Sequence, residues 1–92
     1  MSGIIRKHFK FTGRVQGVGF RYRANYAAQG IGVTGWVRND FDGSVEMEIQ
    51  GTAAQIDHVL KMINKGEYVQ IDSINTTIID VDEDERGFHI RY

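Results

Sequence analysis

The segment SVEMEIQGTAAQ, residues 44–55, joins the clearest strand of the sequence to the start of a helix. Between Val45 and Ile49, apolar residues alternate with glutamates, which is typical of a strand with one buried face. Thr52 and Gln55 have the spacing of a capping box, in which each residue satisfies a backbone N–H at a helix N-terminus. The segment therefore predicts a strand followed at once by a helix.

The helix expected after Thr52 carries a single apolar stripe. Gly66 follows it at the position of a C-terminal cap. A further strand is expected within residues 69–81, and a last short strand follows an acidic turn. The residues of the helical stripe are Ile56, Val59, Leu60 and Ile63, and those that alternate in the last strand are Phe88, Ile90 and Tyr92.

Upstream, residues 39–44 (NDFDGS) predict a turn, since Gly43 tolerates a positive φ. The strand that enters this turn is expected over residues 33–39. Because the turn is short, we expect this strand and the strand at 44–50 to pair as a hairpin.

A helix and a strand precede the hairpin. The helix ends at the stop signals Gly30 and Gly32, and the strand is expected over residues 4–12 with Lys7 as the discordant residue on its apolar face. The apolar face of the helix contains Phe20, Ala24, Ala27, Ala28 and Ile31, and that of the strand contains Ile5, Phe9 and Phe11.

The elements therefore occur in the order strand, helix, strand, strand, helix, strand, with a short strand added. This is the order of the α+β ferredoxin-like fold, a split βαβ (βαββαβ) sandwich. We expect an antiparallel sheet of four to five strands with two helices on one face. No linker, repeat or low-complexity tract interrupts residues 1–92, so a single domain is expected.

The composition excludes several classes of protein. The formal net charge is −1, without the basic excess of a general nucleic-acid binder. Cysteine is absent, which excludes disulfides and thiolate metal sites. No signal-peptide pattern and no apolar run of membrane-spanning length is present, so we expect a cytoplasmic protein that does not associate with membranes.

The segment GRVQGVGFR, residues 13–21, lies between the first strand and the first helix and contains three glycines. Glycines permit the positive-φ conformations in which successive N–H groups form a concave anion-binding nest. Arg21 falls in the first helical turn, where the helix dipole disfavours a cation unless an anion is bound. The segment is therefore consistent with a receptor for a tetrahedral oxyanion, or with a tight strand-to-helix turn that binds nothing.

Two other phosphate-binding motifs are excluded. A Walker A loop needs a lysine after its second glycine, and no lysine occurs between Lys10 and Lys61. A dinucleotide-binding fingerprint would place a third glycine where Tyr22 stands.

The segment at 13–21, followed by GWVRN at 35–39, resembles the acylphosphatase family. The second pattern continues through Gly43, Val45 and Gly51, and the resemblance covers essentially the whole chain. It implies an enzyme, independent of metals and cofactors, that hydrolyses the carboxyl–phosphate bond of acyl phosphates to a carboxylate and inorganic phosphate.

The resemblance also implies a role for each site residue. The loop at 15–20 cradles the phosphoryl oxygens with its backbone amides, Arg21 clamps them, and Asn39 holds the attacking water. Two departures lie outside this site: Phe11 stands where an aliphatic residue is common, and residues 66–73 lack a proline often seen there. The implied phosphate-binding residues are Val15, Gln16, Gly17, Val18, Gly19, Phe20 and Arg21, and the implied catalytic residues are Arg21 and Asn39.

The implied chemistry agrees with these residue types. The leaving carboxylate has a pKa of about 4–5, close to that of side-chain acids, so no general acid is needed. The remaining requirements are to bind the phosphoryl group, to neutralise its charge and to place water in line. Asn39 is no strong base, so the bound phosphate is our hypothesis for the proton acceptor. Without the family pattern, we would favour an ordinary turn residue before DFDG as the interpretation of Asn39.

The expected ligands are a small-molecule acyl phosphate and, as a bound anion, inorganic phosphate or sulfate; the chain is expected to be a monomer. The alternative function is a non-catalytic phosphoanion-binding module, but Arg21 and Asn39 together favour the enzyme because a binder has no need to position water. An RNA-recognition sheet shares the element order, but no segment matches its aromatic motif.

Other candidates receive no functional role. Trp36 could line a site for the acyl part of a substrate, but we favour the interpretation that it packs against a helix or a neighbouring strand. The acidic run at 80–87 lacks the glycine and the final glutamate of a calcium loop. Solvated arginines are expected at Arg14, Arg23 and Arg38, and histidines without metal-ligand spacing are His8, His58 and His89.

Overall fold

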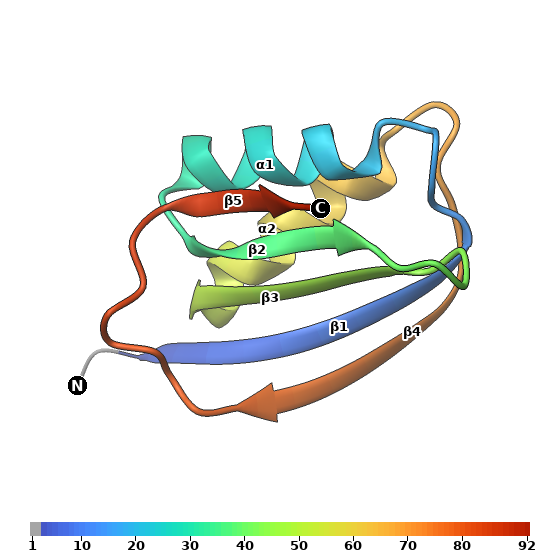
Figure 1. Cartoon of the computed structure of the whole chain (residues 1–92). Helices are drawn as coiled ribbons and strands as arrows, with labels where there is room; N and C mark the ends of the chain where they lie inside the picture. The colour runs from blue at the N-terminus through green and yellow to red at the C-terminus, as the bar shows by residue number, and fades with distance from the viewer. Residues whose placement is uncertain (1–2) are drawn as a thin grey trace.

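The computed structural model describes residues 3–92 (Figure 1). The elements over those residues, in chain order, are β1 (Ile4–Arg14), α1 (Phe20–Ile31), β2 (Thr34–Asn39), β3 (Val45–Thr52), α2 (Ala53–Asn64), β4 (Gln70–Ile79) and β5 (Phe88–Arg91). Both helices lie on one face of the sheet (Figure 1). The predicted ferredoxin-like α+β architecture is confirmed.

The sheet has the strand order β4-β1-β3-β2-β5. Strand β1 pairs antiparallel with β3 and β4, and β2 pairs antiparallel with β3, which confirms the predicted hairpin of β2 and β3. The sheet as a whole is mixed rather than antiparallel, because β5 pairs parallel with β2, from Gly35 opposite Phe88 to Arg38 opposite Arg91. Strand β4 ends where β2 begins, so a connection that crosses this end of the sheet delivers β5 in the direction of β2 (Figure 1).

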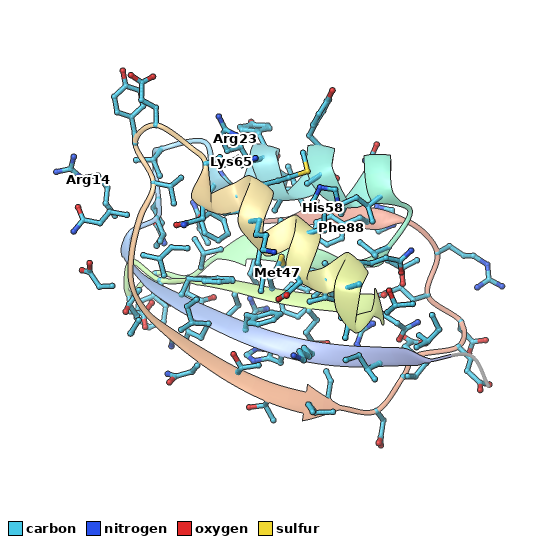
Figure 2. The ribbon with its side chains drawn as sticks, turned by 180° about the vertical axis from the view of Figure 1, so that it is seen from behind. Arg14, Arg23, Met47, His58, Lys65 and Phe88 are labelled. Atoms are coloured by element: carbon cyan, nitrogen blue, oxygen red, sulfur yellow. The ribbon has the colours of Figure 1, made fainter. Side chains whose placement is uncertain are left out.

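The core lies between the helices and one face of the sheet. The side chain of Met47, on β3, lies between α2 and the sheet (Figure 2) and is fully buried. Three phenylalanines pack together at the β1 end of this core: the rings of Phe9 and Phe11 stack with centres 5.6 Å apart, and the tilted rings of Phe11 and Phe20 have centres 4.9 Å apart. Phe20 is the first residue of α1, so this packing fixes where the helix begins.

The first strand differs from its prediction in one respect. Phe9 and Phe11 are buried as expected, and Ile5 packs partly buried against the core. On the opposite, helix-free face, Arg6 is also buried, with its guanidinium 3.1 Å from a carboxylate oxygen of Glu48 and 2.7 Å from one of Glu85. The sequence pattern did not reveal this, because Glu85 lies in the distant β4–β5 connection.

The helix ends agree with the sequence except at Gly30, which lies inside α1 and does not end it, and at Gly66. The Thr52 and Gln55 capping box is formed, and Gly32 caps α1 in the left-handed conformation. The cap of α2 is Lys65 in a right-handed conformation, and Gly66 does not have a positive φ. A Cβ at position 66 would stand 2.8 Å from Val69 Cγ2, so this glycine is required by space and not by backbone conformation.

Candidate active site

A pocket of 260 Å³ lies at the junction of β1 and α1. The end of β2 lies below the first turn of α1 (Figure 1), and its last residue, Asn39, lines the pocket. The structure therefore brings Arg21 and Asn39 into the wall of the same pocket, although they belong to different elements. The lining residues are Val15, Gly17, Gly19, Phe20, Arg21, Tyr22 and Asn39.

The backbone of the β1–α1 loop alternates in handedness. Gly17 and Gly19 have φ of 72° and 82°, and Val18 between them has a negative φ, since no non-glycine residue within the described chain has a positive one. Alternation of this kind turns successive N–H groups toward one side, which forms an anion-binding nest. A Cβ at Gly17 or Gly19 would meet nothing within 4 Å, so φ is the reason for glycine at both positions.

The N-terminus of α1 has no side-chain cap. Its N-cap is Gly19, and no acidic residue stands in the first turn. The N–H of Arg23 donates to the carbonyl of Gly19 at 3.0 Å, which makes it the first amide bonded within the helix. The preceding amides are the unsatisfied donors found at any helix start, at the positive end of the helix dipole. They belong to residues that line the pocket, so an anion there would meet several N–H groups.

The apolar side chains of the loop point away from the pocket chemistry. Val15 and Phe20 are each 1% exposed and belong to the hydrophobic core, against which Val18 also packs. Their burial anchors both ends of the loop and limits its freedom to move.

The side chain of Gln16 bonds to the β2–β3 turn. Its Nε2 donates to the carbonyl oxygens of Asp40 at 2.5 Å and Ser44 at 2.8 Å. The side chain of Gln16 thus connects the β1–α1 loop, the candidate phosphate-binding loop, to Asp40, which directly follows Asn39. These two hydrogen bonds could not be predicted from the sequence, because both acceptors are backbone carbonyls, which every residue has.

Arg21 is half-buried and carries a charge that no carboxylate offsets within residues 3–92. Its guanidinium carbon lies 5.3 Å from the ring centre of Tyr92, a cation–π contact. Two other arginines behave differently: Arg6 is paired with two glutamates, and Arg38 is paired with Asp40 and Glu46. Within the described residues, therefore, Arg21 in this pocket forms no ion pair with a carboxylate, and a bound anion could pair with it.

Asn39 is the last residue of β2 and directly precedes the turn. Its Oδ1 is buried and has no hydrogen-bond partner within the described residues. A buried acceptor without a partner costs about 1–3 kcal/mol, so such atoms usually have a specific reason. A carboxamide oxygen accepts a hydrogen bond from water, and that contact would satisfy Asn39 at the pocket wall.

Carboxylates brace the turn that follows Asn39. The side-chain and backbone groups of Ser44 donate to Asp42 at 2.6 and 3.0 Å; together with Lys10 they lower the pKa of Asp42 to about 2. Burial raises the pKa of Asp40 above its usual value, and the neighbouring Glu46 raises it further. A hydrogen bond with Asp40 lowers the pKa of Glu46 to about 2. The turn is therefore held in place by charge as well as by backbone bonds.

The remaining candidates lie away from the pocket. Trp36 is 7% exposed and packs against neighbouring strands on the helix-free face, where the guanidinium carbons of Arg38 and Arg91 lie 5.1 and 4.7 Å from its ring centre. The expectation that it packs against a strand is confirmed. Arg14 projects into solvent (Figure 2), and exposed Arg23 reaches the carbonyl of Met62 at 3.4 Å.

Residues 3–92, the part of the chain that the structure describes, lack two kinds of feature. That part of the chain contains no group of three or more His, Asp or Glu side chains placed to hold a metal ion. It also contains no helix of the length and apolarity required to cross a membrane.

Comparison with known sequences gives a consistent family. The sequence model of the family described as acylphosphatase matches residues 7–90. The acylphosphatase of Geobacillus kaustophilus is 41% identical over 88 residues, which cover 95% of this chain and 94% of that protein. The acylphosphatase of Bordetella parapertussis is 51% identical over 59 residues, which cover 64% of this chain and 63% of that protein, just under two thirds of its length.

Solved structures agree with the sequence comparison. The acylphosphatase of Bacillus subtilis superposes with a TM-score of 0.86 at 30% identity, covering 96% of this chain and 99% of that one. A full-length HypF, described as phosphate- and nucleotide-bound, superposes with a TM-score of 0.82 at 25% identity, covering 97% of this chain and 12% of HypF. Since the family model spans nearly all of the sequence and these relatives share its fold, the chain belongs to the acylphosphatase family.

Proposed function

We propose that this chain is an acylphosphatase that hydrolyses acyl phosphates to a carboxylate and inorganic phosphate. The observation that supports it most directly is the meeting of an unpaired Arg21 and the unpartnered Oδ1 of Asn39 in one pocket. Membership of the acylphosphatase family supports the same activity. All the proposed residues come from one chain, so a single-domain monomer suffices.

The phosphoryl group is proposed to bind at the loop of residues 15–20 and at Arg21. Its oxygens accept hydrogen bonds from the loop amides, at the positive end of the α1 dipole. The planar guanidinium of Arg21 donates two parallel bonds to the same group and offsets its charge. A HypF structure whose matching part has this fold is described as phosphate-bound, which supports phosphate as a ligand here.

Hydrolysis then requires water in line with the bond that breaks. The Oδ1 of Asn39 accepts a hydrogen bond from the water and turns a lone pair of its oxygen toward phosphorus. A P–O bond forms as the bond to the acyl oxygen breaks, and the bonding electrons leave with the carboxylate. A phosphoryl oxygen takes the proton from the water, so the products are a carboxylate and inorganic phosphate. No step calls for a metal or a cofactor.

The test is release of benzoate from benzoyl phosphate, with and without a chelator. We expect Asn39→Ala to lose about 10²–10³ in kcat, as when one positioned hydrogen-bond group is removed from an active site. Its melting temperature should not fall, because the lost carboxamide leaves no hydrogen bond of Oδ1 broken.

A folded Asn39→Ala variant with near-normal turnover would remove Asn39 from the mechanism. If the wild type bound phosphate but turned over no acyl phosphate, the alternative function, a non-catalytic phosphoanion-binding module, would be supported instead. Loss of turnover in the presence of chelator would contradict the metal-independent chemistry.

A further inference from the structure

A second hollow adjoins the candidate phosphate pocket. It has a volume of 570 Å³, and Asn39 forms part of the wall of both. Two aromatic side chains border it: Phe41, in the β2–β3 turn, and Tyr92, which follows β5. The two hollows therefore meet at Asn39, the residue to which the attacking water is assigned.

Neither aromatic side chain has a packing role in the fold. Phe41 is fully exposed and Tyr92 is 94% exposed. The ring of Tyr92 instead lies over the guanidinium of Arg21, so it links the hollow to the phosphate clamp. Two exposed rings beside a binding pocket are a ready apolar surface for a ligand to cover.

The charges of the hollow are already paired. Lys10 bonds to Asp42 at 3.2 Å, and Arg38 bonds to Asp40 at 3.3 Å and to Glu46 at 3.2 Å. Three carboxylates therefore face two cations, and neither cation is left over for a ligand. A second negative charge on the substrate would be repelled here.

We propose that this hollow binds the acyl part of the substrate and that Phe41 and Tyr92 select uncharged aromatic acyl groups. A substrate whose phosphoryl group is held at Arg21 extends its acyl group past Asn39, between the two rings. A small acyl group such as acetyl does not reach them, and an anionic group such as succinyl meets the surplus carboxylate. The inference rests on the proposed function, because Arg21 must hold the other end.

The experiment compares kcat/KM for benzoyl, acetyl and succinyl phosphate, each divided by the uncatalysed rate. For the wild type we expect benzoyl first and succinyl last. Phe41→Ala should lower the value for benzoyl phosphate roughly five- to tenfold, since about half the contact surface of a ring is lost. It should change the value for acetyl phosphate less than about twofold, because that substrate does not reach the ring.

Two controls make the result specific. Phe41→Tyr keeps a ring and should restore the benzoyl preference, and Tyr68→Ala removes an aromatic side chain that is also exposed but lies in the α2–β4 connection. The inhibition constant of inorganic phosphate should be unchanged in Phe41→Ala, since phosphate fills only the neighbouring pocket.

Equal losses for benzoyl and acetyl phosphate in Phe41→Ala would overturn the inference, as would a wild type that favours succinyl phosphate. In both cases, turnover that still depends on Asn39 would mean that the proposed hydrolase function is correct although the acyl-binding inference is wrong. Absence of turnover with every acyl phosphate would remove both proposals.

Discussion

Arg21 stands in the first turn of α1, at the end of the helix where the dipole disfavours a cation. No carboxylate within the described chain offsets it, and the ring of Tyr92 contributes only a weak cation–π attraction. An anion that binds to both the unpaired guanidinium and the unsatisfied amides would make this arrangement favourable. At the scale of single residues, this is the strongest physical sign of a phosphate site.

Arg21→Lys should abolish phosphate binding while preserving the fold. An ammonium is a point charge and cannot replace the bidentate guanidinium. In the wild type, phosphate at about one hundred times its Kd should add about 2.7 kcal/mol of stability and raise the melting temperature.

Thermal unfolding with and without phosphate checks this prediction. Arg23→Lys, on an exposed arginine of the same helix outside the pocket, is the matched control and should keep the full shift. A full phosphate shift retained in Arg21→Lys would contradict the clamp.

The sequence was informative about Arg21 and Asn39 because their motifs are local and long. The sequence did not indicate the hydrogen bonds from the Gln16 side chain to the β2–β3 turn. Hydrogen bonds to backbone carbonyls leave no trace in residue identity. The adjacent hollow was missed for a similar reason: Phe41 and Tyr92 border one hollow only because β5 lies beside β2.

At the scale of elements, the β2–β3 hairpin carries Asn39 and is braced by Asp42. Hydrogen bonds from Ser44 and Lys10 lower the pKa of this carboxyl to about 2, below its ordinary value. A carboxyl whose pKa is lower when folded stabilises the native state above its unfolded pKa. That contribution is lost as the pH falls from about 4 toward 2.

Asp42→Asn should therefore lower the melting temperature near pH 6, and the difference from the wild type should shrink as the pH falls to 2. Thermal melts at intervals across this range measure the trend. Asp57→Asn, which alters an exposed carboxyl on α2, serves as the control. A difference that stays constant with pH would mean that the charge of Asp42 does not support the turn.

Elements were predictable where the pattern is periodic. The strand and capping box around Thr52 and the apolar face of α1 are local features, and both were confirmed. The exposed strand β4 was only located within a range, since its residues are mostly polar at the edge of the sheet. The parallel pairing of β5 depends on the path of the chain across the sheet, which no local pattern encodes.

At the scale of the whole molecule, Arg6 holds the β4–β5 connection against the sheet. Its side chain is 5% exposed and bonds to Glu48 on β3 and to Glu85 in the connection. The hydrogen bond to Glu85 raises the pKa of Arg6, so the pair stays charged. The connection in turn delivers β5, and with it Tyr92, to the edge of β2.

Arg6→Met should destabilise the protein by about 3 kcal/mol, because it leaves two carboxylates in a largely buried site without their cation. Urea denaturation gives the free energy of unfolding. Arg86→Met, on an exposed arginine of the same connection, should change it by less than about 0.5 kcal/mol. A loss for Arg6→Met no larger than this control would show that the buried ion pairs do not hold the connection.

Two functions are proposed to be separate within one pocket: Arg21 and the loop amides hold the phosphoryl group, and Asn39 only directs water. Calorimetric titration of Asn39→Ala with inorganic phosphate, alongside its turnover of benzoyl phosphate, tests this most directly. We expect the Kd of phosphate to stay within about twofold of the wild type. A large loss of phosphate affinity in this variant, with turnover falling only in proportion to it, would contradict the claim.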